Sequence, residues 1–126
     1  MKLSNEKILI DIQKLRELSQ MQLPVKASYA LAKNIAKIES ELKIYNKERE
    51  KLIDKYAEKD DKGIIESDEA GQIIFKEGCR QLWDKDINEL LAIENEIDIH
   101  KFSIAALEGY SMTAAELMLI DYMIEE

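Results

Sequence analysis

Cysteine, histidine, proline and glycine are all scarce in this chain of 126 residues, which holds one cysteine, one histidine, one proline and four glycines. A single cysteine excludes an internal disulfide framework and a zinc site built from several cysteines. Glycine and proline are the residues that most often interrupt regular structure. Their scarcity therefore favours long helices with few turns.

Long apolar runs are missing as well. No run approaches the roughly 20 apolar residues that cross a bilayer, so we expect no membrane partner. The N-terminus carries Glu6, Lys7 and Asp11 where a secretory signal requires an apolar stretch. We therefore expect a protein that is not secreted and that resides in a reducing cytoplasm.

The charge of the chain is unevenly distributed. Apolar residues make up 46% of the sequence, enough for a core, and we expect a single domain over residues 1–126. The formal net charge is −8, yet residues 1–53 hold 11 basic and 7 acidic residues, whereas residues 54–126 hold 7 and 19. Phosphate binding requires Lys and Arg, so the acidic half argues against direct nucleic-acid binding. It either faces a basic partner or only keeps the protein in solution.

The first half of the chain has the apolar spacing of two helices. The pattern predicts one helix over residues 4–20 with Ser4 as its N-cap, and a second from residue 25 to about 58, after Pro24. We expect residues 4–58 to form a helical hairpin. The second helix carries an apolar seam at alternating spacings of four and three, interrupted only at Arg49. The seam is formed by Leu31, Ile35, Ile38, Leu42, Tyr45, Leu52 and Tyr56.

The second half contains shorter predicted elements. Two β-branched runs around a glycine-bearing turn predict a β-hairpin over residues 63–76, followed by a helix over residues 78–94. Residues 97–105 alternate like a strand or an extended return. A capping-box pattern at Thr113 opens a C-terminal helix over residues 113–125.

These elements predict an α+β fold that is predominantly α. The long helical hairpin is expected to pack with two further helices and to carry the small β-hairpin or a three-stranded sheet. The predicted core consists of Ile12, Leu15, Ile35, Ile38, Leu42, Leu82, Trp83, Ile87, Leu90, Phe102, Leu117, Ile120 and Ile124.

The predicted C-terminal helix is apolar on nearly every side. A helix of this kind is either central in the fold or covered by another chain, and both alternatives stay open here. In the second case, the candidate interface residues are Leu117, Met118, Ile120, Tyr122, Met123 and Ile124.

The search for catalytic chemistry finds no recognisable site. The sequence lacks the P-loop, dinucleotide-binding and nucleophile-elbow patterns. Cys79 lies on the apolar stripe of the helix predicted over residues 78–94, which favours a buried structural cysteine. His100 lies in an alternating segment, where a surface or strand-face position is expected. We therefore expect no catalytic residues, no cofactor, no metal and no enzymatic activity.

A small ligand is an alternative to a protein partner. A nucleotide signal needs Arg or Lys for its phosphate and an aromatic side chain for its base. The candidate residues for such a pocket are Arg80, Trp83 and Tyr29.

Four stretches of the chain resemble a known family. They are Leu23–Glu39, Lys55–Gly63, Glu96–His100 and Ala115–Glu126, which together are similar to a family of small uncharacterised proteins from tailed phages and prophages of Gram-positive bacteria. That family has no assigned activity or catalytic residues. The resemblance implies a phage-encoded protein that acts in the cytoplasm of an infected cell or in a virion.

The sequence thus predicts a non-enzymatic, phage-encoded interaction protein. It would be either a virion assembly or accessory factor, or an inhibitor that binds a bacterial defence component. The partner is expected to be a host or phage protein, or a second copy that associates through the long helix or the C-terminal helix. The alternative is a protein that binds and sequesters a nucleotide signal.

Overall fold

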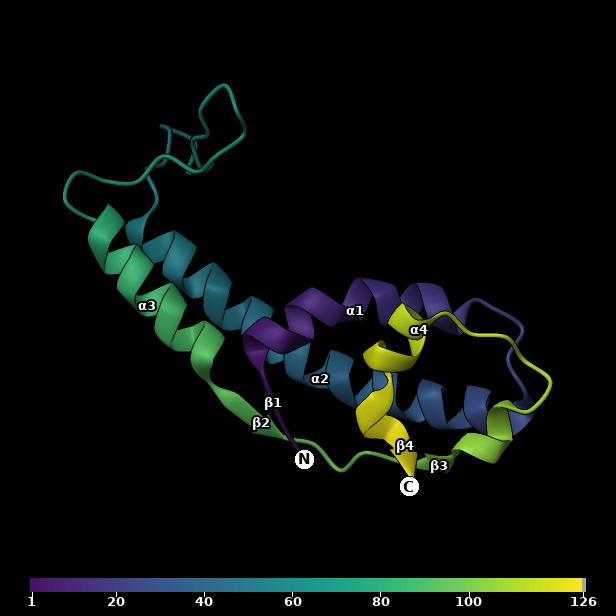
Figure 1. The fold of residues 1–126 in the computed structure, drawn as a ribbon. Coiled ribbons are helices and arrows are strands. Elements are labelled where there is room, and N and C mark those ends of the chain that lie inside the picture. The colour runs from purple at the N-terminus through teal and green to yellow at the C-terminus, as the bar shows by residue number, and fades with distance from the viewer. Residues whose placement is uncertain (126) are drawn as a thin grey trace. The chain divides into compact units, whose positions relative to one another are not determined.

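The computed structural model describes residues 1–125, and their contacts gather in two compact units. Unit 1 comprises Met1–Leu42 together with the segment that starts at Glu94, and unit 2 comprises Lys43–Ile93. The sequence led us to expect one domain over residues 1–126, of which Glu126 lies outside the described residues. The helix α2 (Val25–Tyr56) belongs to both units, because its 32 residues are too many for one small core. The fold is α+β and predominantly α, as predicted (Figure 1).

Unit 1 is built on α1 (Asn5–Ser19) and the first half of α2, which confirms the two predicted helices. The Ser4 hydroxyl accepts the backbone N–H of Lys7 at 3.1 Å and so caps α1. The apolar stripes of the two helices form the core, with Ile12, Leu15, Ile35, Ile38 and Leu42 all buried as predicted.

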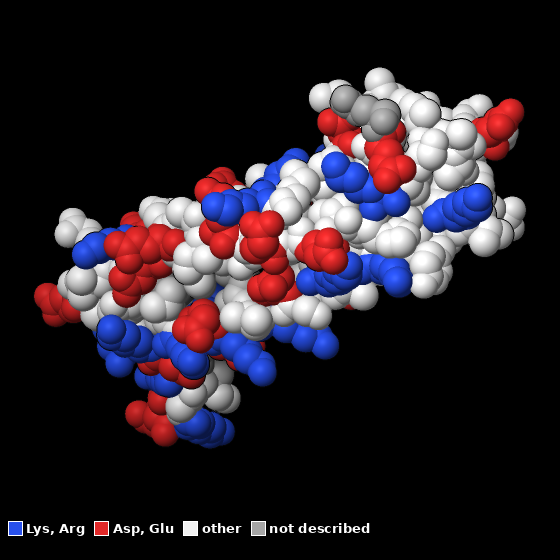
Figure 2. Space-filling model, turned by 90° about the horizontal axis from the view of Figure 1, so that it is seen from below, with Lys and Arg blue, Asp and Glu red and all other residues white. Residues whose placement is uncertain are grey.

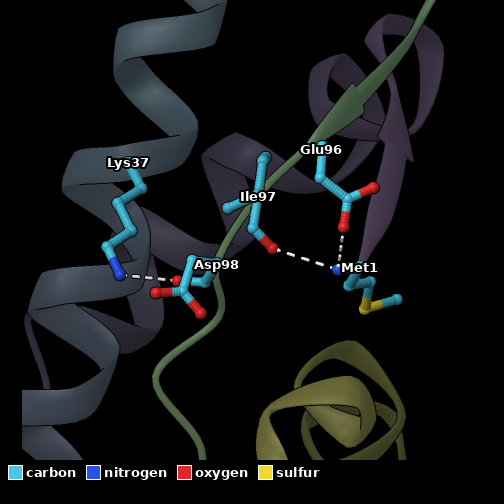
Figure 3. Close-up of polar contacts among 5 residues, drawn as sticks. All are labelled: Met1, Lys37, Glu96, Ile97 and Asp98. Atoms are coloured by element: carbon cyan, nitrogen blue, oxygen red, sulfur yellow. Dashed lines mark hydrogen bonds and ion pairs between the residues drawn. The ribbon is translucent and has the colours of Figure 1, made fainter.

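A short antiparallel ladder joins the N-terminus of the chain to residues far along the sequence. β1 (Lys2–Ser4) pairs with β2 (Glu94–Glu96). The Met1 ammonium group donates to the Glu96 carboxylate at 2.9 Å and to the carbonyl of Ile97 at 3.2 Å (Figure 3). Three-residue strands are too short to leave an alternating pattern, so the sequence did not predict this ladder.

The segment after β2 is fixed to α2 by side chains. The fully buried Asn34 donates to the carbonyl of His100 at 2.9 Å and accepts the N–H of the same residue at 2.7 Å. Lys37 donates to the carbonyl of Asp98 (Figure 3). These side chains take the place of a neighbouring strand. Of residues 97–105, predicted as a strand or an extended return, only β3 (Phe102–Ser103) is a strand.

The predicted C-terminal helix over residues 113–125 is much shorter in the structure. α4 (Ala114–Leu119) has six residues and begins with the predicted capping box, in which Thr113 and Glu116 bond each other's backbone N–H. A 3₁₀ turn over Asp121–Met123 follows, and β4 (Ile124–Glu125) pairs in parallel with β3. Ile120, at the end of α4, and Met123, in this turn, are both buried in the core.

Unit 2 pairs the second half of α2 with α3 (Arg80–Ala92), and the Tyr56 hydroxyl donates to the Asp86 carboxylate at 2.6 Å (Figure 1). No residue of α3 is fully buried. Trp83, Ile87 and Leu90 are half-buried, and Leu82 is 50% exposed, so Leu82 is not the core residue we predicted. A helix that packs on one other helix covers only a narrow stripe of its surface.

The predicted β-hairpin over residues 63–76 is instead part of a three-sided arrangement that includes the end of α2. We call residues 57–76 the β-triangle. Isolated bridges join Ala57 to Phe75, Lys59 to Ile65 and Ser67 to Ile73. Three backbone hydrogen bonds connect the segments in a ring. The N–H of Glu58 donates to the carbonyl of Ile74, the N–H of Ile74 donates to the carbonyl of Glu66, and the N–H of Glu66 donates to the carbonyl of Glu58.

The turns of the β-triangle repeat one design. Asp60 accepts two backbone N–H groups with one carboxylate oxygen, at 2.8 and 2.9 Å, and Asp68 does the same at 2.9 Å. Gly63 and Gly71 each follow three residues later with φ near +78°, a conformation that favours glycine. Asp-x-x-Gly thus recurs after eight residues, and this repeat is a sequence signal for the two turns. The prediction rested on the two β-branched runs instead, and it therefore contained only a hairpin.

Candidate functional site

The first candidate site is a groove between α1 and α4, both in unit 1. It encloses about 460 Å³, and we call it the α1–α4 groove. Four apolar side chains and Ala115 make up its walls, and five charged residues complete the lining. The lining residues are Lys7, Asp11, Lys14, Glu17, Leu18, Met21, Ala115, Glu116, Met118 and Leu119.

Two of the carboxylates that line this groove are the buried Asp11 and the half-buried Glu116. Asp11 is 7% exposed, and one of its oxygens lies 2.8 Å from the Lys7 ammonium group. Glu116 accepts the N–H of Thr113 with one oxygen, as part of the capping box. Its other oxygen is buried and has no hydrogen-bond partner among residues 1–125. The groove thus holds one carboxylate that is paired with Lys7 and one whose second oxygen has no hydrogen-bond donor among residues 1–125.

Methionine side chains form the accessible edge of the groove. Met118 is 77% exposed and Met21 is 48% exposed, although both are large and apolar. Methionine is flexible and polarisable, so its side chain adapts to partners of different shape. The groove therefore presents two kinds of contact to a partner, an apolar contact from the exposed methionines and a polar contact from a carboxylate.

Tyr122 lies near Asp11, one of the carboxylates that line the groove. Burial, and to a lesser extent the negative charge of Asp11, raise the pKa of Tyr122 to about 12. The phenol is therefore neutral at ordinary pH. Its half-buried position shows that the residue belongs in part to the core of unit 1.

The six candidate interface residues occupy different environments in the structure. Met118 lines the groove and is exposed, whereas Leu117 and Ile124 are half-buried. Ile120 and Met123 are buried in the core of unit 1. These two residues are therefore core residues and not part of an accessible surface.

The second candidate site is a cavity of about 460 Å³ beside the start of α2, which we call the Tyr29 pocket. The Tyr29 ring meets the His100 ring edge-on at 5.9 Å between centroids, and the Lys33 ammonium group lies 5.0 Å from the Tyr29 centroid. Tyr29, Phe102, His100 and two lysines line the pocket with small and polar residues. The lining residues are Lys26, Tyr29, His100, Lys101, Phe102, Ser103, Ala105, Ala106 and Glu125.

The other two candidate ligand residues belong to unit 2, whereas Tyr29 belongs to unit 1. Trp83 packs on Phe75 at 5.2 Å between ring centroids, and Arg80 lies over the same ring and pairs with Asp84 at 3.3 Å. The sequence did not indicate Lys26, His100 or Lys101 as ligand-binding residues, although all three line the Tyr29 pocket. Lys26 was detectable, since it precedes Tyr29 by one helical turn, but the other two depend on the bonds from Asn34.

Other kinds of site are not found in the described part of the chain. Among residues 1–125, no group of three or more His, Cys, Asp or Glu side chains is arranged to hold a metal ion. The helices described here include none that is long and apolar enough to cross a membrane. Cys79 is a half-buried free thiol just before α3.

Comparisons of the chain with models of protein families, with curated proteins and with solved structures found no match. Two cavities of unit 1, the α1–α4 groove and the Tyr29 pocket, are therefore the observations from which we argue function.

Proposed function

We propose that this chain is a non-enzymatic interaction protein that binds another protein through the α1–α4 groove. The observation that supports this proposal is the buried Glu116 oxygen, which has no hydrogen-bond donor within the described residues. A buried carboxylate oxygen without a donor costs free energy, and a donor from a bound partner removes that cost.

The chemistry of the groove favours a basic side chain of the partner. The aliphatic stem of a lysine or arginine packs on Met21 and Met118, while its charged head reaches Glu116. Lys7 already neutralises Asp11, and Lys14 and Glu17 offset each other, so Glu116 supplies the remaining charge. Unit 1 as a whole holds 8 basic and 13 acidic residues, which also attracts a basic partner.

A role without catalysis is consistent with what the two carboxylates already do. Asp11 is held by Lys7 in an i,i+4 ion pair, and Glu116 completes the cap of α4. Both carboxylates therefore contribute to the fold of unit 1, and no cluster of metal-binding side chains is found among residues 1–125.

The resemblance to small proteins of tailed phages and prophages supports a biological setting for this binding. We propose a phage-encoded protein that acts in the cytoplasm of an infected cell or in a virion. It serves either as a virion assembly or accessory factor or as an inhibitor of a bacterial defence component. A basic surface on the partner is expected in both cases.

Affinity capture with matched variants tests the proposal. The immobilised full chain is incubated with a lysate of phage-infected Gram-positive cells, and the recovered proteins are identified by mass spectrometry. Met118→Glu removes the apolar contact from an exposed position, and Glu116→Gln keeps an acceptor for the cap but removes the charge. We expect both variants to lose a protein that the wild type and the control Lys43→Ala recover. That protein is then purified, and direct binding is measured.

Two results contradict the proposal. One is a purified partner that binds the wild type and both groove variants with equal affinity. The other is a wild-type chain that recovers nothing beyond what Met118→Glu recovers. A wild-type dimer in sedimentation that Met118→Glu dissociates would assign the groove to a second copy of this chain.

A further inference from the structure

We propose that the Tyr29 pocket binds a mononucleotide, a small ligand that carries a phosphate group and an aromatic base. This site is separate from the α1–α4 groove, and its lining shares no residue with the groove. Four observations support it: unpaired cations, an exposed aromatic ring, a fixed backbone and a suitable volume.

The cations are available to an anionic ligand. Lys26 and Lys101 line the pocket, and neither forms an ion pair within residues 1–125. Lys33 adds a third positive charge beside the Tyr29 ring. Glu125 is the one acidic residue in the described lining. The first turn of α2 contains no acidic residue to offset its N-terminal positive potential. The local field therefore favours a phosphate, although unit 1 is acidic overall.

The aromatic ring is open to solvent. Tyr29 is 57% exposed, so its ring is accessible to a ligand. A planar base stacks on such a ring, and stacking contributes about 1–3 kcal/mol per base in proteins that bind single strands. His100 stands edge-on to Tyr29 and limits the orientation of the ring.

The backbone that carries His100 and Lys101 is held in place before any ligand arrives. The two hydrogen bonds from the buried Asn34 to His100 fix this segment against α2. A site whose residues are already positioned loses less entropy on binding.

The size and the charge of the surroundings favour a single nucleotide over a nucleic acid. A cavity of about 460 Å³ lies within the usual range of small-molecule sites. Unit 1 as a whole holds 13 acidic and 8 basic residues, a balance that repels a polyanion. The size and the charge therefore favour a mononucleotide, which carries one base and one phosphate group.

Calorimetric and NMR titrations of the full chain with AMP, GMP, CMP and UMP test this inference. At least one of them is expected to bind the wild type. Tyr29→Leu and Lys101→Ala alter exposed side chains, and each is expected to weaken that binding at least tenfold. Lys43→Ala, in unit 2, is the matched control and is expected to bind as the wild type does.

Ligand fragments separate the two parts of the site. Ribose 5-phosphate lacks the base, and the nucleoside lacks the phosphate, so both are expected to bind more weakly than the nucleotide. The inference is overturned by a wild type that gives neither heat nor shifted NMR signals with all four nucleotides. It is also overturned by equal binding of ribose 5-phosphate, by variants that bind normally, or by a single-stranded oligonucleotide that binds more tightly through the same residues. None of these results bears on the α1–α4 groove, which is tested by Met118→Glu.

Discussion

At the scale of single residues, Asn34 connects the core to the Tyr29 pocket. Its amide bonds both the N–H and the carbonyl of His100, so one buried side chain replaces two rungs of a strand ladder. Sequence spacing alone placed Asn34 between two seam residues of α2 and gave no hint of this role. A buried amide in a helix is informative only when the segment that it bonds is known.

Replacement of Asn34 by Ala leaves two backbone groups of His100 without a partner. We expect the free energy of unfolding to fall by roughly 1–3 kcal/mol, the usual cost of a buried polar group left unsatisfied. Chemical denaturation followed by circular dichroism measures this change. Lys33→Ala, one residue away and on the surface, is the control and should leave stability nearly unchanged. Equal stability of Asn34→Ala and the control would show that these bonds do not fix the segment.

Ile38 and Ile44 lie on the same helix in different environments, because Ile38 is buried and Ile44 is exposed. Ile38→Ala is expected to cost about 2–5 kcal/mol, the range for a large aliphatic residue removed from a core. Ile44→Ala should change stability by about 0.5 kcal/mol or less. Urea unfolding of both variants measures the difference. Similar effects at the two positions would contradict the observed face of α2.

Tyr122 predicts a dependence of stability on alkaline pH. The pKa of this phenol is about 12 in the folded chain and about 10 when the chain is unfolded. Between these values the unfolded chain loses the proton while the folded chain keeps it, so stability falls as the pH rises from 10 to 12. We expect the melting temperature to fall less steeply over this range in Tyr122→Phe than in the wild type. Parallel curves would contradict the buried position of the phenol.

At the scale of elements, the long helices were predictable and the short elements were not. The apolar seam of α2 repeats over many turns, so local sequence determines that helix. The end of α4 is determined elsewhere. β3 offers a backbone partner to Ile124 and Glu125, and these two residues pair with it as a strand and do not continue the helix. A tertiary contact of this kind overrides a local helical pattern, which is why residues 113–125 were predicted as one helix.

The pairing of α3 with a single helix predicts how readily it opens. None of its residues is fully buried, whereas α2 between Ala30 and Leu42 carries several buried side chains. We expect backbone amides in α3 to exchange with solvent deuterium faster than those in that part of α2, as measured by mass spectrometry or NMR. Equal protection of the two segments would mean that α3 is covered in solution by something other than α2.

In the whole molecule, the charges are distributed differently along the sequence and over the surface, and only some site residues could be predicted. Basic and acidic side chains alternate over the face drawn in Figure 2, although the sequence separates them into a basic and an acidic half. The sequence selects Met118 as a candidate interface residue because the last helix has more apolar surface than one face needs, and Met118 lines the groove. Asp11 was not predictable, since it reaches the groove only when α1 packs on α4. In the same way, Tyr29 was predictable but its neighbours His100 and Lys101 were not.

We propose that the α1–α4 groove binds a basic side chain of another protein through Glu116. Calorimetry tests this proposal by measuring the dissociation constant of the purified captured partner for the wild type and for Glu116→Gln. Loss of a hydrogen bond to a charged group is worth about 1.5–3 kcal/mol, so we expect Glu116→Gln to weaken binding by at least tenfold. An unchanged dissociation constant would contradict the proposal.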